Sequence, residues 1–411
     1  MSKRTKRAKP KRAGARRRKT ERRRNSMRRN SMRQHKIIIP NSSTTEEQLV
    51  KSRIDGDLDI SNVHSANDLA ESVRSYSPGV NKLLVSKRQE MTAHDIFGCG
   101  LEEILIDGDH LFERRHSMVK VAEGPVCKPW NSKEAIQVML DNLRAAGPVD
   151  VQSVVTPRQI DSNCWFNTFF VTFFISDKGR KFFRFFRELM IRGEDVRKKK
   201  LTPGMAHAFF FLNACIEAAY NNKNVALAMN TNHIILKIFD SIRKKDIDEM
   251  NEKGLGDVDE AGNPLDYYIA MMEYIDNKTI RHVRLRAPEE VDSLFRSQST
   301  LTPHLFVVEI IETPMSKIPT QFKAGRHTYV LDASVVMDTQ RKHFCSTLVC
   351  AGKEMGFDGA SFSRLEPFKW KALLNQDKDW TFEGSIFDED ATDKIWWNFQ
   401  KSYKLLFYYR T

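Results

Sequence analysis

The spacing of the apolar residues changes near residue 280, and this change limits the folds open to the chain. Before it, apolar residues recur at helical spacing, as in 131–147, where Asn131 is a candidate N-cap and Gly147 ends the run. Three further segments share this spacing: 164–175 continuing into 182–191, 202–220 and 263–275. After it come short β-rich runs separated by Pro, Gly and Lys, at 280–285, 304–311, 327–337, 343–350, 353–357 and 404–409. Helices followed by strands predict an α+β domain.

The positive charge of the chain is concentrated at its N-terminus. Residues 1–36 hold 18 Lys and Arg against one acid, Glu21, so 48 basic and 52 acidic residues of the totals 66 and 53 remain for the rest, a net charge of about −4. A segment with so few apolar side chains cannot offset its ordering entropy, so we expect a disordered tail. The predicted units are a disordered basic tail (1–45), a linker and helical accessory region (46–150) and a folded α+β domain (151–411).

The tail has the composition of a nucleic-acid-binding arm. A dense polycation gains affinity for phosphate backbones by counterion release, without reading the bases, which makes nucleic acid an expected partner of residues 1–36. A nuclear-import signal is an equally good and compatible interpretation. Ser26 and Ser31 each follow two arginines in a repeated Arg-Arg-Asn-Ser-Met, a pattern of basophilic kinase sites, although a small duplication without regulation explains it too.

The composition excludes several other classes of protein. No run approaches the roughly 18 apolar residues of a membrane span, and the basic N-terminus contains no secretory apolar region. Six cysteines in a chain of this length predict no disulfide framework. No two of them have the CxxC spacing of a zinc site. We therefore expect a soluble protein of a reducing intracellular compartment, without membrane, metal or organic cofactor.

The clearest candidate for chemistry is the segment that ends at Cys164. A polar loop, 158–163, leads into this cysteine, which opens an aromatic-rich helix. Unpaired amides and the positive end of the helix dipole favour a thiolate there. Gln159, five residues upstream, is placed to donate to the oxyanion of an acyl-transfer intermediate. A cysteine among aromatic residues is also typical of a buried core, so this segment alone does not decide.

The second half of the chain supplies a candidate base. Residues 343–358 predict a β-hairpin with its turn at Ala351 and Gly352. Counted outward from a centre between Cys350 and Ala351, His343 lies opposite Asp358, where the carboxylate fixes the imidazole. A surface histidine in a strand is the alternative. His327 is the nearest competitor, but the strand that follows it has no turn to bring a carboxylate back. Four other histidines have no comparable acid partner in the sequence and are interpreted as structural, namely His207, His233, His282 and His304.

These motifs resemble the papain-like cysteine peptidases, and among them the ubiquitin-specific proteases. The resemblance covers about residues 150–411. Its cysteine box is similar to Cys-Trp-Phe-Asn at 164–167, with the oxyanion-stabilising amide at Gln159. Its histidine box resembles Tyr-Val-Leu at 329–331, His-Phe at 343–344 and Phe-Asp at 357–358, and its usual C-terminal strand resembles 403–409. The resemblance implies a papain-like fold, with a helical lobe carrying the cysteine and an antiparallel sheet carrying His343 and Asp358.

The chain departs from the family pattern in three places. The residues before the nucleophile are Asp-Ser-Asn at 161–163, closer to ovarian-tumour-type deubiquitinases; Gly359 replaces a second Asp; and the paired CxxC zinc fingers that grip ubiquitin are missing. The resemblance therefore implies the chemistry more firmly than the substrate. Expected partners are ubiquitin or ubiquitin-like conjugates, or viral structural proteins.

The function that the sequence favours is a cysteine-dependent (iso)peptidase that cleaves after the C-terminal glycine of ubiquitin or a ubiquitin-like protein. Cys164 is the expected nucleophile, His343 the base, Asp358 the residue that orients it, and Gln159 an oxyanion donor. Two alternatives stay open: a protease that processes structural proteins of a large DNA virus while tethered to nucleic acid, and a catalytically dead nucleic-acid-binding scaffold. The matching locations are the nucleus, or a virus factory or virion.

Overall fold

The structure is a computed structural model of the 411-residue chain. It describes residues 36–39, 94–106, 117–121, 126–145, 149–160, 162–221, 225–226, 231–241, 265, 269, 272, 280–296, 303–311, 317–340, 343–360, 364–386 and 394–411. Most of the predicted basic tail and linker, and most of the predicted helix at 263–275, lie outside these ranges.

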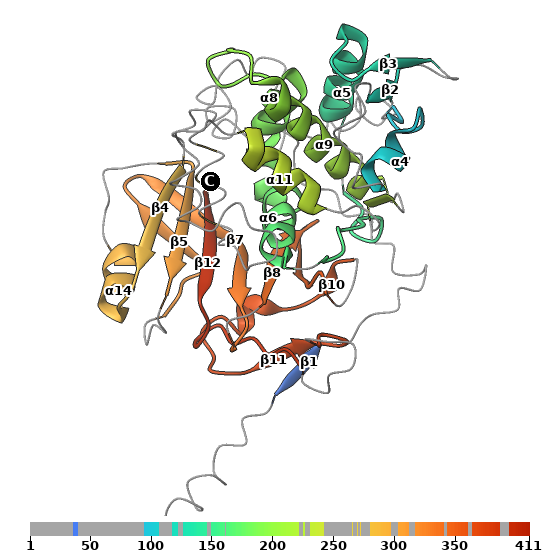
Figure 1. Cartoon of the computed structure of the whole chain (residues 1–411). Coiled ribbons are helices and arrows are strands. Elements are labelled where there is room, and N and C mark those ends of the chain that lie inside the picture. The colour runs from blue at the N-terminus through green and yellow to red at the C-terminus, as the bar shows by residue number, and fades with distance from the viewer. Residues whose placement is uncertain are drawn as a thin grey trace, which may run out of the picture.

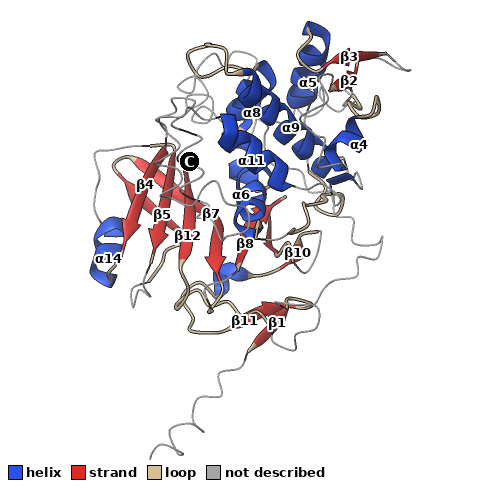
Figure 2. Cartoon of the chain, viewed as in Figure 1, coloured by secondary structure: helices blue, strands red, loops and turns tan. Residues whose placement is uncertain are grey.

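Helices make one side of the molecule and a sheet makes the other, so the fold is a mixed α and β architecture (Figure 2). The helices are α4 (Leu101–Ile106), α5 (Lys133–Ala145), α6 (Cys164–Phe174), α7 (Asp177–Phe182), α8 (Arg184–Arg192), α9 (Pro203–Tyr220), α11 (Thr231–Ser241) and α14 (Pro288–Arg296). The helices predicted at 131–147, 164–175, 182–191 and 202–220 therefore form, with ends that differ by one or two residues. The hydroxyl of Ser132, rather than Asn131, accepts the Ala135 amide at the start of α5.

The sheet contains eight strands in the order β10-β9-β8-β7-β12-β5-β4, with β6 paired to β7. Its strands are β4 (Ile280–Leu285), β5 (Leu305–Ile310), β6 (Gln321–Ala324), β7 (His327–Met337), β8 (Phe344–Cys350), β9 (Lys353–Phe357), β10 (Glu366–Pro367) and β12 (Lys404–Arg410). The pairing is antiparallel except between β4 and β5, which are parallel. All six predicted strands are present, and β12 lies between β5 and β7 (Figure 1).

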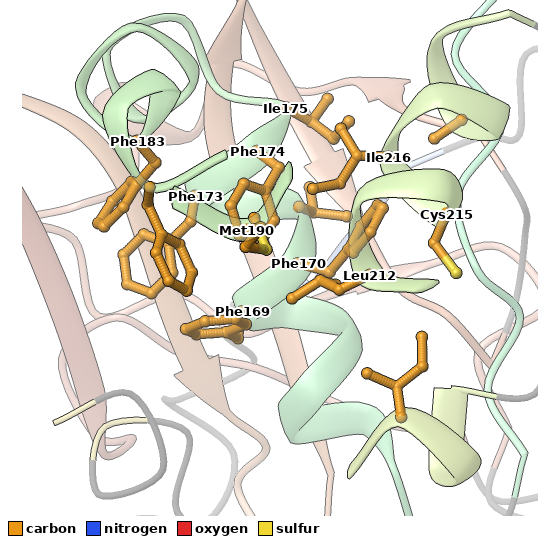
Figure 3. Packing of buried hydrophobic residues seen from close by; sticks show 14 of the residues in the cluster. Phe169, Phe170, Phe173, Phe174, Ile175, Phe183, Met190, Leu212, Cys215 and Ile216 are labelled. Atoms are coloured by element: carbon orange, nitrogen blue, oxygen red, sulfur yellow. The ribbon is translucent and has the colours of Figure 1, made fainter. Parts of the chain in front are cut away.

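Helix α6 joins the helical side to the sheet. All eleven of its residues are buried, which explains why its sequence is apolar around its whole circumference rather than on one face. Its aromatic side chains pack among Phe183, Met190 and Leu212 (Figure 3) and reach the sheet at Phe407 of β12, whose ring meets that of Phe173. The nucleophile predicted at the start of α6 is thus carried by the centre of the core.

Two aspartates fasten the far end of α6 to the sheet. Asp332 of β7 accepts a 2.8 Å hydrogen bond from the amide of Lys178 in α7. Asp177 accepts 2.8 Å hydrogen bonds from the amides of Ala351 and Gly352, in the turn between β8 and β9. The hairpin turn is therefore where the sequence predicted it, and it is tied to the helical side.

A short β-strand and a disulfide contradict the expectations from the sequence. Residues 37–39, inside the predicted disordered tail, form strand β1 (Ile37–Ile39), which pairs in parallel with β11 (Trp380–Phe382). Cys99 and Cys127 form a disulfide, with Cα atoms 5.9 Å apart. The predicted absence of a disulfide framework rested on the small number of cysteines for a chain of this length, and it missed that β2 (Met118–Lys120) and β3 (Cys127–Pro129) return the chain toward α4.

Within the described part of the chain, no helix combines the length and the apolar character needed to cross a membrane.

Candidate active site

Cys164 is the first residue of α6, and its side chain is almost fully buried. The first amides of a helix have no carbonyl partner inside the helix, so they present donors and a partial positive charge to a group placed there. Burial raises the pKa of the thiols of the three other free cysteines, Cys215, Cys345 and Cys350. These three thiols are held in the unreactive protonated form.

A buried amide network shapes the loop in front of Cys164. The side-chain oxygen of Asn163 accepts hydrogen bonds from the Ile160 amide (3.0 Å) and from Asn167 Nδ2 (3.2 Å). The hydroxyl of Thr231, at the start of α11, accepts from Asn163 Nδ2 (2.9 Å) and donates to Asn167 Oδ1 (3.0 Å). Asn163, Asn167 and Thr231 are all fully buried. A satisfied network of this kind holds the loop in one conformation.

His343 lies at the start of β8, where Asp338 fixes its backbone. The amide of His343 donates to Asp338 Oδ1, and the amide of Asp338 donates to the carbonyl of His343, both at 2.7 Å. The ring of His343 is buried beside that of Trp397, with centroids 5.9 Å apart. The turn from β7 to β8 therefore sets where the imidazole lies.

Asp358 contacts the imidazole directly. Its Oδ1 lies 2.6 Å from His343 Nε2 and accepts the Ala360 amide at 3.0 Å. Its Oδ2 accepts a 2.6 Å hydrogen bond from the hydroxyl of Ser385. The carboxylate is fully buried, so these partners hold it in one orientation.

The predicted register of the hairpin is wrong by two residues, although the side chains meet. Ser346 pairs with Phe357 and Cys350 with Lys353, so His343 and Asp358 are not directly opposed. A shift by two keeps every side chain on the same face of a sheet and leaves a diagonal neighbour within reach of a long side chain. This explains why the contact survives the error.

The Cys164 side chain is close enough to the imidazole of His343 to help raise its pKa. Because Nε2 of the ring is bound to Asp358, Nδ1 is the nitrogen left for the thiol. Burial alone would lower the pKa of His343, but the carboxylate of Asp358 and the Cys164 side chain outweigh it and raise this pKa well above its usual value. The site thus favours an imidazolium next to the sulfur, as thiol catalysis requires.

Gln159 lies beside this site, in the loop ahead of Cys164. Its backbone amide donates a 2.9 Å hydrogen bond to the carbonyl of Gly359, the residue after Asp358. A Cβ built on Gly359 would be 3.5 Å from both the Gln159 nitrogen and Asn167 Nδ2. The four residues predicted for the site, on three separate segments, are therefore brought to one place: Cys164, His343, Asp358 and Gln159.

Sequence reasoning missed the residues that support these four. Ser385, Asp338 and Thr231 lie in segments without a motif, and only their long-range hydrogen bonds reveal them. His282, interpreted as structural, contacts Glu309 (2.9 Å), an acid partner that the sequence did not reveal. Burial disfavours ionisation of Glu309, but hydrogen bonds from His282, Arg284 and Tyr403 outweigh this and lower its pKa to about 2. This carboxylate is therefore the centre of an ion-pair cluster.

Among the described residues, no group of three or more His, Cys, Asp and Glu side chains is arranged to hold a metal ion.

Comparisons with known proteins give structural likeness only. No protein-family model matches the chain, and no curated protein does. Among solved structures, a chain of the SAGA DUB module of Ubp8, Sgf11, Sus1 and Sgf73 bound to monoubiquitin has 9% identity and a TM-score of 0.39, over 64% of this chain and 70% of that one. An essential yeast splicing factor has 7% identity and a TM-score of 0.35, over 63% and 70%. The same DUB module in another structure has 11% identity and a TM-score of 0.34, over 74% and 82%.

Proposed function

We propose that the chain is a cysteine-dependent (iso)peptidase of the papain-like type, acting on ubiquitin or ubiquitin-like conjugates after their C-terminal glycine. The observation that carries the proposal is the buried pair of His343 and Asp358, 2.6 Å apart, with Cys164 at the start of α6 close enough to raise the pKa of His343. A nucleophile, a base and a residue that orients the base in hydrogen-bond contact are the requirement for covalent acyl transfer.

In this mechanism the Cys164 sulfur attacks the carbonyl carbon of the C-terminal glycine and forms a thioester, and the imidazolium of His343 protonates the amine that leaves as the C–N bond breaks. Water attacks the resulting thioester, with His343 taking its proton, and the acid product leaves. Asp358 keeps Nδ1 of His343 directed at the sulfur. The side-chain amide of Gln159 and the backbone N–H of Cys164 are the proposed oxyanion donors.

The substrate is supported by the sequence resemblance, and an activity-based probe tests it. We expect a ubiquitin-vinyl-sulfone probe to modify the full chain at Cys164, with the Cys164→Ala variant unmodified. Modification by a general thiol-protease probe alone would instead indicate a processing protease for other proteins, such as viral structural proteins. No reaction with either probe, in a folded chain, would indicate a dead scaffold.

A second proposed activity is nucleic-acid binding through residues 1–36, and the observation behind it is the charge separation. These residues carry a net +17 while the rest of the chain is about −4. Binding to a fluorescent duplex of arbitrary sequence should fall steeply with salt for the intact chain and hardly occur after deletion of residues 1–33, because counterion release scales with the phosphates neutralised. Equal salt slopes for both chains would place the binding surface on the folded domain.

A further inference from the structure

Strand β1, just after the basic tail, pairs with β11. Shortly after β11 the chain reaches Ser385, which contacts Asp358. The three residues of β1 pair in parallel with Trp380–Phe382 of β11, and the carbonyl of Ile39 accepts a 2.9 Å hydrogen bond from the amide of Glu383. Ile39 is buried in the apolar cluster that includes Trp380 and Phe382. Lys36 lies over the ring of Trp396, 4.1 Å from its centroid. Figure 1 shows β1 and β11 side by side, on the side of the sheet away from the helices.

From β11 a short path leads to the site. The amide of Ser385 donates to the carbonyl of Phe382 (3.2 Å), and the Ser385 hydroxyl donates to Asp358 (2.6 Å). Phe382 also packs on β9, the strand that ends one residue before Asp358, because a Cβ built on Gly356 would lie 2.5 Å from the Phe382 ring. The position of β11 therefore affects the carboxylate through a hydrogen bond and through packing.

A second path leads from β11 to the base. The rings of Trp380 and Trp397 are stacked with centroids 5.3 Å apart, and Trp397 contacts His343. The amides of these two tryptophans also donate to each other's carbonyls, at 2.9 and 2.8 Å. Trp380 is the residue that pairs with Ile37 of β1. Both the base and its carboxylate thus border the segment on which β1 lies.

We propose that β1 is a positioning strand for the site: its pairing with β11 holds Ser385 and Trp397 in place, so that the segment following the basic tail controls the orientation of Asp358 and His343. The inference rests on the proposed function, because it concerns the regulation of the same site. A two-stranded pairing of three residues is marginally stable by itself, so its occupancy is open to control by what binds the neighbouring tail.

The test compares full-length variants at Ile39. Ile39→Asp places a charge in the apolar seat, whereas Ile39→Val keeps an apolar β-branched side chain and is the matched control. We expect Ile39→Asp to lower kcat at least about 10-fold, which is the effect of losing one charged hydrogen bond in the site, with KM within about 3-fold of wild type. Ile39→Val should stay near wild type. A synthetic peptide of residues 34–41, added in trans, should restore the rate of Ile39→Asp.

A second pair of variants tests the backbone contact without changing β1. Glu383→Pro removes the amide that donates to Ile39, and Glu383→Ala keeps it. We expect a loss of rate for the proline variant only. The two Glu383 variants test whether β1 positions the site even if Ile39→Asp does not fold.

Alkylation of Cys164 by iodoacetamide separates failure of this inference from failure of the proposed function. If wild type does not turn over any ubiquitin substrate, the proposed function fails, yet slower alkylation in Ile39→Asp and Glu383→Pro than in their controls still supports the positioning role. Equal alkylation and equal turnover in all four variants would overturn the inference.

Discussion

The hydroxyl of Ser385 donates a 2.6 Å hydrogen bond to Oδ2 of Asp358, on the side of the carboxylate that does not contact His343. Both residues are buried, so water does not compete for this contact. Ser385 stands 27 residues after Asp358 in the sequence. Ser385 supplies a fixed hydrogen-bond donor to Asp358. In this chain Gly359 stands at the position where the family it resembles has a second Asp.

Ser385→Ala should lower kcat about 10-fold, because a hydrogen bond to a charged group is lost and Asp358 gains rotational freedom. The pKa of His343 should fall toward its ordinary value, which NMR of the ring measures. Ser402→Ala is the matched control: it removes a buried hydroxyl that has no hydrogen-bond partner within the described structure. Equal effects of the two substitutions on kcat would contradict a role for Ser385.

Substitution of the three central residues should give a graded result. Cys164→Ala and His343→Ala should each abolish turnover while thermal unfolding shows an intact fold, because residues of such a unit act together. Asp358→Asn should retain more activity, since orientation rather than bond making is removed. Wild-type hydrolysis by Cys164→Ala would show that the assignment is wrong.

Gln159→Ala should reduce kcat about 100-fold and leave substrate binding nearly unchanged, as expected of a donor used mainly in the transition state. Steady-state kinetics separates the two quantities. An unchanged kcat would assign the oxyanion to backbone amides near residue 161.

Thr231→Val tests the network ahead of Cys164 at nearly constant volume. Asn163 and Asn167 lose a shared partner in a buried site, which should cost about 1 to 3 kcal/mol of unfolding free energy and lower kcat. Thr231→Ser keeps the hydroxyl and should restore kcat, even where the lost methyl group reduces stability. If Ser and Val lower kcat equally, packing at this position is what matters.

Asp332→Asn should alter how stability depends on pH. Burial, together with the nearby Asp177, raises the pKa of Asp332 to about 6 despite the hydrogen bonds it accepts. The native state thus binds this proton more tightly than the unfolded chain, so stability is highest below about pH 4 and falls as the pH rises to about 6. Urea unfolding at pH 4 and pH 8 should show the variant gaining about 2 kcal/mol relative to wild type. The same pH dependence in both proteins would contradict the prediction.

The sequence predicted the parts of the fold whose signal is local. Strand β7 and the hairpin of β8 and β9 follow from β-branched runs and a Gly turn, and α9 begins at Thr202, whose hydroxyl accepts the Met205 amide (3.4 Å). Cys164 and Gln159 were predicted from a polar loop that opens a helix, and His343 and Asp358 from a hairpin that brings them together, so these signals are local as well; the roles of the four residues stay predictions.

The rest depends on contacts between distant segments. Thr231 reaches Asn163 across 68 positions, and β1 reaches β11 across most of the chain. No periodicity or turn residue encodes such a partner. The disulfide was missed for the same reason, because cysteine count and spacing do not say which chain segments return to each other.

The position of β12 between β5 and β7 has a consequence for biosynthesis. The ribosome makes β5 and β7 first, and until residues 404–410 emerge, each of these strands presents a row of unpaired amides and carbonyls. Both strands contain several Val and Leu residues, so the nascent chain carries two aggregation-prone edges during this interval. The incomplete domain should therefore depend on chaperones. If translation terminates before residue 404, the product should aggregate rather than form a smaller folded domain.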